Sequence, residues 1–190
     1  MNNQEELWAG DFGQKYTDRN RVDWWARMAF WRTVLNKTGA RSVTEVGCNA
    51  GWNLSAIRRV HSDVQLSGIE INEYAAHQAR AAGLPVTTTL LALPRADLVF
   101  TAGVLIHQNQ DALKNMMEAI IAASYQWVLA VEYPADKEEH VKYRGMDGYL
   151  WRRPYGRMYR NMGLIEVDSW PVTMKDGFDN CTAWLLKKPT

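Results

Sequence analysis

Residues 47–51 are the first stretch of this 190-residue sequence that could bind a ligand. Gly47-x-x-x-Gly51 follows a β-branched run at 43–46 and precedes a helical pattern at 51–60. Gly47 allows a sharp turn at the end of the strand, and Gly51 leaves room for a ligand or a neighbouring backbone. The start of a helix offers unpaired N–H groups to an anionic or polar group. The loop predicts a nucleotide-type site only weakly, because many strand–turn–helix units bind nothing.

Glu70 strengthens the prediction. It lies 19 positions beyond Gly51, at the end of the second strand pattern, residues 64–70. A carboxylate at this place in a βαβ nucleotide fold binds ribose hydroxyls. The alternative is a surface residue that caps the helix expected at 73–82. The apolar neighbours Ile69 and Ile71 favour the ribose role.

Four further side chains are candidates for catalysis. His107 follows a strand pattern at 97–102, and Glu132 and Tyr133 follow another at 127–131. An imidazole titrates near neutral pH, so His107 is the preferred general base, although a histidine here could also simply orient a loop. Glu132, Tyr133 and His140 are reserve candidates. The four histidines show no ligand spacing with Asp or Glu, so no metal is expected.

Strands and helices alternate through the middle of the chain, which predicts an α/β fold with a parallel sheet and right-handed crossovers. Ligands of such sheets bind outside the carboxyl ends of the strands, where Glu45, Glu70, His107 and Glu132 would share one edge. Beyond residue 160, a turn at 176–177 separates the last two strands. The expected strands are 43–46, 64–70, 86–89, 97–102, 127–131, 164–170 and 181–187, and the expected helices are 22–36, 51–60, 73–82 and 111–123.

These segments resemble the class I S-adenosylmethionine (SAM)-dependent methyltransferases. The likeness rests on Glu45-x-Gly47-x-x-x-Gly51, on Gly68-Ile69-Glu70 and on residues 97–107. Within that superfamily the chain is similar to the small methylases associated with pseudaminic acid biosynthesis, through residues 7–20, 104–107 and 143–153. Asn49 stands where the family loop often has a glycine, and asparagine tolerates the left-handed conformation that such a turn needs.

The resemblance implies a Rossmann-like domain over residues 1–190, with a seven-stranded, mostly parallel sheet, an antiparallel last strand and helices on both faces. It implies an N-terminal helical arm at 1–40 and a substrate-facing insertion at 134–162. It also implies SAM as cofactor and S-adenosylhomocysteine as product. Arg19 would pair with the methionyl carboxylate, unless the arm simply packs and leaves it solvated. The expected cofactor-binding residues are Tyr16, Arg19, Glu45, Gly47, Cys48, Asn49, Gly51, Glu70, Ile71, Leu90, Leu91, Thr101 and Ala102, with the adenine near Leu90 and Leu91.

The acceptor is expected to meet the basic stretch 137–160, which has seven Lys or Arg and three Asp or Glu with aromatic residues between them. Arginines suit a carboxylate or phosphate, so the favoured acceptor is a hydroxyl of an acidic sugar or glycan precursor. An ordinary solvated insertion would show the same charges. The expected substrate-binding residues are Arg144, Trp151, Arg152 and Arg153.

Two other functions stay open. An N-methyltransferase acting on a small amine or peptide would have acidic and aromatic groups, rather than arginines, around its acceptor. A regulatory module that binds SAM without catalysis would keep the loop and Glu70. A dinucleotide-dependent dehydrogenase is disfavoured, because Gly47-x-x-x-Gly51 lacks the G-x-G-x-x-G spacing.

Charge and composition disfavour nucleic acid and membrane as partners, so the expected partner is a small-molecule acceptor. The net charge of +1 and the lack of a DPPY-like tetrapeptide after residue 101 disfavour nucleic acid. No apolar run approaches the ~18 residues of a membrane span, and the Trp-rich helix at 22–36 is expected to pack on the sheet rather than on a membrane or a dimer partner. Cys48 and Cys181 form no CxxC pair, which favours a reducing, cytoplasmic location. A monomer or a homodimer is expected.

Overall fold

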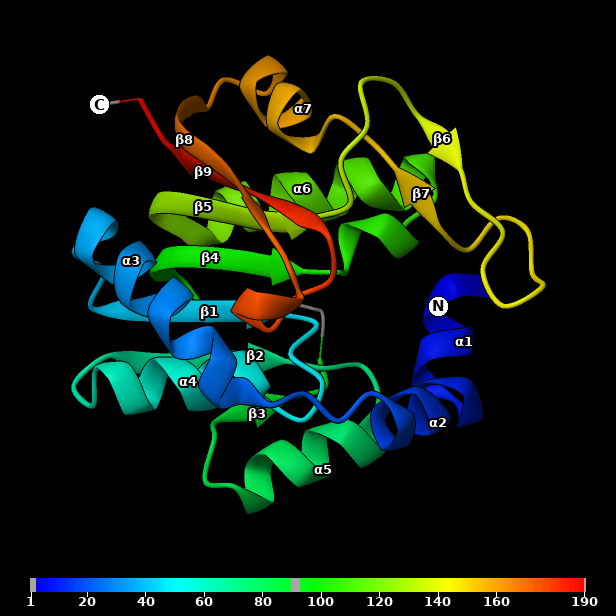
Figure 1. Cartoon of the computed structure of the whole chain (residues 1–190), viewed down its shortest axis with the longest axis horizontal. Helices are drawn as coiled ribbons and strands as arrows, with labels where there is room; N and C mark the ends of the chain where they lie inside the picture. The colour runs from blue at the N-terminus through cyan, green and yellow to red at the C-terminus, as the bar shows by residue number, and fades with distance from the viewer. Residues whose placement is uncertain (1–2, 90–92, 190) are drawn as a thin grey trace.

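A seven-stranded sheet forms the centre of the protein in the computed structural model, which describes residues 3–89 and 93–189 (Figure 1). The strand order is β3-β2-β1-β4-β5-β9-β8. The first five strands are parallel, whereas β9 runs antiparallel between β5 and β8. The strands are β1 (Ser42–Val46), β2 (Gln65–Ile69), β3 (Val86–Thr87), β4 (Ala96–Ala102), β5 (Ser124–Glu132), β8 (Ile165–Val172) and β9 (Cys181–Lys187).

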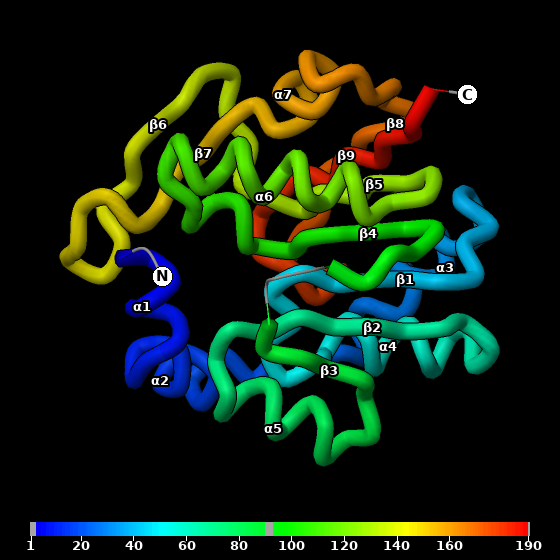
Figure 2. The backbone as a smooth tube through the Cα atoms, turned by 180° about the vertical axis from the view of Figure 1, so that it is seen from behind, coloured from blue at the N-terminus to red at the C-terminus, as the bar shows by residue number. Residues whose placement is uncertain are grey.

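Helices cover both faces of this sheet because successive strand residues point to opposite sides. On β4, Leu98 and Phe100 pack toward α3 and α4, whereas Val99 packs toward α6 and α7. The view from behind shows α6 lying across β4 and β5 (Figure 2). The helices of the two layers are α3 (Met28–Thr38), α4 (Trp52–Val60), α5 (Glu73–Ala81), α6 (Gln110–Ala123) and α7 (Tyr155–Asn161).

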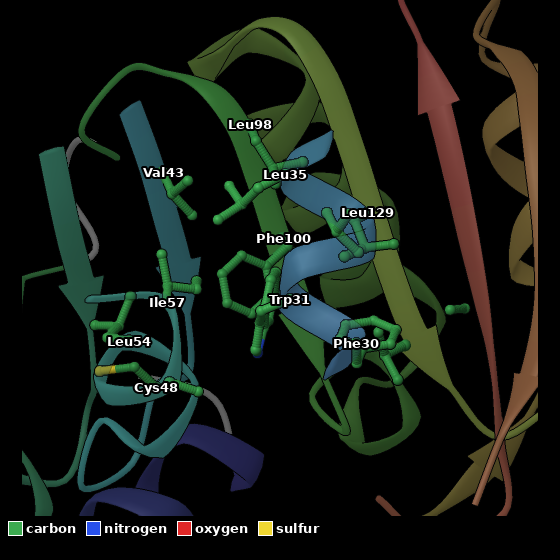
Figure 3. Packing of buried hydrophobic residues seen from close by; sticks show 14 of the residues in the cluster. Phe30, Trp31, Leu35, Val43, Cys48, Leu54, Ile57, Leu98, Phe100 and Leu129 are labelled. Carbon is green, nitrogen blue, oxygen red and sulfur yellow. The ribbon is translucent and has the colours of Figure 1, made fainter. Parts of the chain in front are cut away.

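The Trp-rich segment packs on the sheet, as predicted. It begins as the 3-10 turn η1 (Trp24–Arg27) and continues as α3. Trp31 is fully buried, and its ring centroid lies 4.5 Å from that of Phe100 on β4 (Figure 3). Phe30 and Leu35 fill the same core. Within the described part of the chain, no helix combines the length and the apolar character that crossing a membrane requires.

Two regions differ from the expected elements. The third strand is only two residues long, and the helix α7 was missed inside the basic stretch. Tyr155 and Tyr159 are both fully buried and lie four positions apart, so one face of α7 packs into the core. That helical spacing is visible in the sequence but was obscured by the surrounding charges. The remaining elements are α1 (Asn3–Ala9), α2 (Asp11–Arg19), η2 (Leu105–His107), η3 (Met174–Asp176) and the small sheet of β6 (Glu139–His140) and β7 (Trp151–Arg152).

Gly51 provides a test of the packing beneath the loop. Its φ is +78°, and an added Cβ would lie 2.2 Å from Leu84 Cδ1, whereas Gly39 has φ +62° and nothing within 4 Å of such an atom. Gly39→Ala should therefore cost about 1–2 kcal/mol, the penalty of a left-handed backbone. Gly51→Ala should cost about 1–3 kcal/mol more because of the overlap. Urea unfolding of both variants measures the difference, and equal losses would contradict the overlap with Leu84.

Candidate active site

A cavity opens at the carboxyl ends of β1, β2 and β4, the sheet edge that the sequence predicts. Residues of α1 and α2 also line it, and these two helices lie beyond the carboxyl ends of the strands (Figure 1). Four segments supply most of the cavity lining. They are the end of β1 and the loop after it (Glu45, Val46, Gly47, Cys48, Asn49), the end of β2 and the residues after it (Ile69, Glu70, Ile71, Asn72), the end of β4 and the segment after it (Ala102, Gly103, Val104, His107, Gln108) and the N-terminal helices (Gln4, Glu5, Trp8, Gly13, Tyr16). Val22, Arg27, Trp52, Asn53 and Met116 complete the lining.

The loop after β1 has a left-handed backbone at three positions. Gly47, Asn49 and Gly51 have φ values of +73°, +50° and +78°. Asn49 thus keeps the turn, as predicted for an asparagine at this place. The backbone N–H groups of Gly47 and Cys48 donate to the Ile69 carbonyl at 2.7 and 3.0 Å, which fixes the loop to β2. Gly51 is not among the lining residues, and the space that it leaves is filled by the Leu84 side chain rather than by a ligand.

Glu70 is held at the rim of the cavity by two backbone amides. Its Oε2 accepts from Asn49 N at 2.7 Å, and its Oε1 accepts from Asn72 N at 2.8 Å. The side chain is buried, and burial raises the pKa of Glu70, while the amides of Asn72 and Asn49 act in the opposite direction. The alternative role as cap of α5 is wrong, because the N-cap is Asn72, whose Oδ1 accepts from Ala75 N.

Asn72 also ties the first helix to the site. Its Nδ2 lies 2.9, 3.1 and 3.0 Å from the carbonyl oxygens of Trp8, Ala9 and Gly10, where α1 ends. The last carbonyls of a helix have no partner within the helix, so one amide side chain supplies donors for this end of α1. Sequence reasoning missed this residue: an Asn before a helical run predicts an N-cap, but nothing local indicates contact with a helix some 60 positions away.

Glu45 is the centre of a buried polar network. Its Oε1 accepts from Asn53 Nδ2 at 2.6 Å, and Asn53 Oδ1 accepts from Arg27 Nη1 at 2.9 Å and from Trp31 Nε1 at 3.2 Å. Glu45 Oε2 is buried and has no hydrogen-bond partner among the described residues. Burial raises the pKa of Glu45 to about 8, opposed by Asn53 and Arg27. An unpaired carboxylate oxygen in a cavity lining suits a ligand that brings a donor or a positive charge.

The arginine at this cavity is Arg27, not Arg19. Arg19 is exposed, its guanidinium lies 5.2 Å from the Phe12 ring centroid, and it is not part of the lining, whereas Tyr16 is. Arg27 lines the cavity and lies 4.3 Å from the ring centroid of Phe178. Its Nε donates to the Gly177 carbonyl at 2.9 Å. Sequence reasoning did not identify Arg27 as a residue of the site.

His107 lies in the cavity wall as a neutral imidazole. Its Nδ1 is 2.7 Å from the Tyr149 carbonyl, which only accepts hydrogen bonds, so Nδ1 carries the proton and Nε2 keeps its lone pair. Burial lowers the pKa of His107 to about 4, and the bond to Tyr149 acts in the opposite direction. The ring packs against Trp8 and Tyr143, with centroids 4.6 and 5.1 Å away.

Glu132 and Tyr133 lie behind this wall. Glu132 is fully buried and accepts from the backbone N–H groups of Val104, Leu105 and Ile106 at 3.2, 3.2 and 3.4 Å. It therefore fixes the turn that presents His107. Burial raises the pKa of Glu132 to about 7, with these amides opposing. The Tyr133 hydroxyl donates to Asp179 at 2.8 Å, and neither Glu132 nor Tyr133 belongs to the cavity lining.

The four residues expected to bind the acceptor do not line the cavity. Arg153 is buried, and it donates to Glu138 Oε2 at 2.7 Å and to the Gln108 carbonyl at 2.9 Å. Trp151 is buried beneath it, and Arg144 and Arg152 are exposed. The basic stretch supports the wall from behind, through the Tyr149 carbonyl and the Tyr143 ring, instead of forming it.

The remaining predicted residues divide as follows. Cys48 and Ala102 line the cavity, whereas Thr101 is fully buried outside the lining. Burial raises the pKa of the Cys48 thiol well above its usual range. Leu90 and Leu91 lie outside the described residues. Over residues 3–89 and 93–189, no group of His, Cys, Asp and Glu side chains is arranged to hold a metal ion.

Comparisons with known proteins agree with this fold. No protein-family model matches the chain. The chain is 33% identical over 128 residues to the 24-methylenesterol C-methyltransferase 2 of Oryza sativa subsp. japonica, an alignment that takes in 57% of this chain. It covers 35% of the rice protein, so the chain spans about a third of that relative's length.

Two solved structures superpose on nearly the whole chain. The 1,6-didemethyltoxoflavin-N1-methyltransferase of Burkholderia thailandensis, solved with S-adenosylhomocysteine, has a TM-score of 0.73 at 16% identity, covering 97% of this chain and 88% of that one. The magnesium protoporphyrin IX methyltransferase of Synechocystis PCC 6803, solved with SAM, has a TM-score of 0.72 at 10% identity, covering 100% and 99%. The chain has the Rossmann-like methyltransferase fold, and the predicted fold class is confirmed.

Asn72→Ser tests the tether of α1. Serine retains the N-cap acceptor for α5 but removes the amide donor that reaches the end of α1. Backbone amides of α1 and α2 should exchange with deuterium about tenfold faster, the effect of losing roughly one hydrogen bond. The amides of α5 should keep their protection. Asp23→Ser, at the N-cap of η1, is the control, and unchanged exchange in α1 of the Asn72 variant would contradict the tether.

Glu45→Gln tests the buried carboxyl. The folded protein holds the proton of Glu45 up to about pH 8, whereas the unfolded chain releases it above pH 4.5. Its contribution to stability is therefore full below pH 4.5 and is lost as the pH rises to about 8, by roughly 1 kcal/mol per pH unit. The variant should not show this loss, so its advantage over the wild type should grow through that window. Urea unfolding at pH 5, 6.5 and 8 measures this, and parallel curves would show that Glu45 titrates normally.

Proposed function

We propose that this protein transfers the methyl group of SAM to a small-molecule acceptor. The observation that carries the proposal is Glu70, a buried carboxylate fixed by two backbone amides at the rim of a cavity above β2. Ribose hydroxyls are the partners that this position of the fold offers to a carboxylate. The rice relative is named as a methyltransferase, which supports the same type of reaction.

The other polar groups of the cavity fit the methionyl part of SAM. The unpaired Oε2 of Glu45 is a suitable acceptor for its α-ammonium group. The positive charge of Arg27 lowers the negative potential near Glu45, and its guanidinium suits the carboxylate of the methionyl group. The left-handed loop at 47–51 leads into the start of α4, a favourable place for polar and anionic groups. When bound, SAM supplies an electrophilic methyl group on a sulfonium, and the protein has only to position an acceptor and exclude water.

His107 and the two appended segments have distinct roles in this proposal. His107 lines the cavity and keeps the lone pair of its Nε2, and it takes the proton that the acceptor loses. Within the arm, α1 and α2 cover the cavity, and the insertion 134–162 holds His107 through Tyr149. The buried, unpaired thiols of Cys48 and Cys181 support a reducing, cytoplasmic location.

An acidic sugar, the acceptor expected from the resemblance to the pseudaminic acid-associated methylases, has less support. Its recognition was assigned to Arg144, Arg152 and Arg153, which lie outside the cavity lining. The proposal is therefore limited to a small-molecule acceptor.

Calorimetric titration with SAM and S-adenosylhomocysteine tests the cofactor. Wild-type protein should bind both, and Glu70→Gln should weaken binding about 10- to 100-fold, the value of hydrogen bonds to a charged group. Glu73→Gln, an exposed side chain three positions further on, should bind like the wild type. Circular dichroism confirms that each variant is folded. Absence of binding by the wild type would overturn the methyltransferase proposal, and binding without turnover on any acceptor would favour a regulatory module.

A further inference from the structure

The cavity lining has two parts, and the cofactor is assigned to one of them. Glu45, Glu70 and the loop after β1 form the part that we call the sheet side. The other part comes from α1 and α2, which lie beyond the carboxyl ends of the strands, and from η2, which follows β4 (Figure 1). We call it the helical side, and it consists of Gln4, Glu5, Trp8, Tyr16, His107 and, directly after η2, Gln108. It is the part that remains for the acceptor.

The helical side offers no unpaired charge to an acceptor among the described residues. Glu5 already has an interaction partner within the protein. Burial lowers the pKa of His107 to about 4 and raises the pKa of Tyr16 to about 12, so both rings are uncharged at pH 7. The lining contains one Lys or Arg side chain in the described part of the chain, Arg27, and it is bonded on the sheet side. A charged acceptor would therefore leave water without gaining a partner of opposite sign, which is costly.

Trp8 and His107 carry complementary hydrogen-bonding atoms. Both residues line the cavity, and their ring centroids lie 4.6 Å apart. Trp8 Nε1 only donates, and it is buried without a partner among the described residues. His107 Nε2 only accepts, because the proton of the ring is on Nδ1, bonded to the Tyr149 carbonyl. A hydroxyl can accept from the first atom and donate to the second, whereas a carboxylate has no proton to donate and an ammonium has no lone pair to accept with.

Aromatic rings form the apolar surface of the helical side. The rings of Trp8 and Tyr16 are nearly perpendicular, at 83°, with centroids 5.1 Å apart, and both line the cavity. Such a pair presents the face of one ring beside the edge of the other. A flat ring packs well on this surface, whether it is an aromatic ring or the CH-bearing face of a sugar.

From this juxtaposition of Trp8, Tyr16 and His107, with no unpaired charge beside them, we infer that the acceptor is an uncharged compound with a flat ring, methylated on a hydroxyl oxygen. The inference rests on the proposed function and names the substrate class of the same site. It differs from the acidic sugar expected from the sequence in that the acceptor carries no charge.

The chemical step follows from these positions. The hydroxyl oxygen forms a bond to the methyl carbon of SAM, and the bond from that carbon to sulfur breaks with its electron pair left on sulfur. As the new bond forms, the oxygen becomes positive and its proton becomes much more acidic than an imidazolium. His107 Nε2 therefore accepts that proton even though the pKa of the ring is low. After the methyl ether and S-adenosylhomocysteine leave, the imidazolium passes the proton to water.

Binding of matched compounds tests the charge preference. Protein saturated with S-adenosylhomocysteine is titrated with two series, each sharing one ring: glucose, glucuronate and glucosamine, and phenol, benzoate and benzylamine. In one series the neutral compound should bind about tenfold more tightly than both the acid and the amine, whose charges would stay unpaired. The series that shows the preference distinguishes a sugar from an aromatic acceptor. Absence of the preference from both series would overturn the inference, whereas failure of the wild type to bind S-adenosylhomocysteine would overturn the proposed function.

Transfer to the preferred neutral compound tests the role of His107. The wild type should methylate this compound, and His107→Gln should slow the transfer about 100-fold, the lower end of the contribution of a general base. The affinity for the compound should stay within about threefold, because the glutamine side chain also accepts a hydrogen bond. His77→Gln, at an exposed position of α5 outside the lining, should match the wild type in both measurements.

Circular dichroism shows whether each variant is folded. A folded His107→Gln variant that transfers methyl groups at the wild-type rate would overturn the proton transfer to His107. A wild type that binds the neutral compound and SAM but does not methylate the compound would overturn the inference on the acceptor.

Discussion

The geometry of the cavity rim depends on the pairing of the buried Glu70 carboxylate with two backbone amides. A buried carboxylate is costly unless donors satisfy it, and here Asn49 and Asn72 supply them from separate segments. The bond to Asn49 stabilises the left-handed loop, and the bond to Asn72 fixes the turn that begins α5. Because the Asn72 side chain continues to the end of α1, the same carboxylate indirectly positions the helices that cover the cavity.

The buried glutamates Glu132 and Glu45 differ in how their carboxylate oxygens are bonded. This difference distinguishes a supporting residue from a functional one. Three backbone N–H groups donate to Glu132, so the cost of burying this carboxylate is offset inside the protein, and the side chain holds η2 in place. Among the described residues, one side chain donates to Glu45 and its second oxygen has no partner, and the indole N–H of Trp8 also has none. Each such atom costs about 1–3 kcal/mol in the folded state. Both residues line one cavity, which favours a ligand as the missing partner.

The parts that the sequence predicted are those specified by local patterns. Apolar runs ending at Gly47 and Glu70 placed two strands and their shared edge, and the tolerance of asparagine for positive φ placed Asn49. The missed or misplaced parts depend on contacts between distant segments. Arg27 is held by the carbonyl of Gly177, 150 positions away, and no periodicity reveals that contact. The charges of the basic stretch indicated a pocket wall, yet Arg153 is paired with Glu138, and Arg144 and Arg152 are exposed outside the cavity lining.

The two sides of the cavity are therefore constrained differently. On the sheet side, Glu45 and Glu70 are bound to particular backbone and side-chain partners, so their chemistry is fixed by the fold. On the helical side, Asn72 holds α1 through backbone carbonyls, which every residue possesses. Side chains of α1 that face the cavity, such as Glu5 and Trp8, can then change without loss of that tether. Under the proposed function, we expect α1, α2 and η2, rather than the loop at 47–51, to select the acceptor.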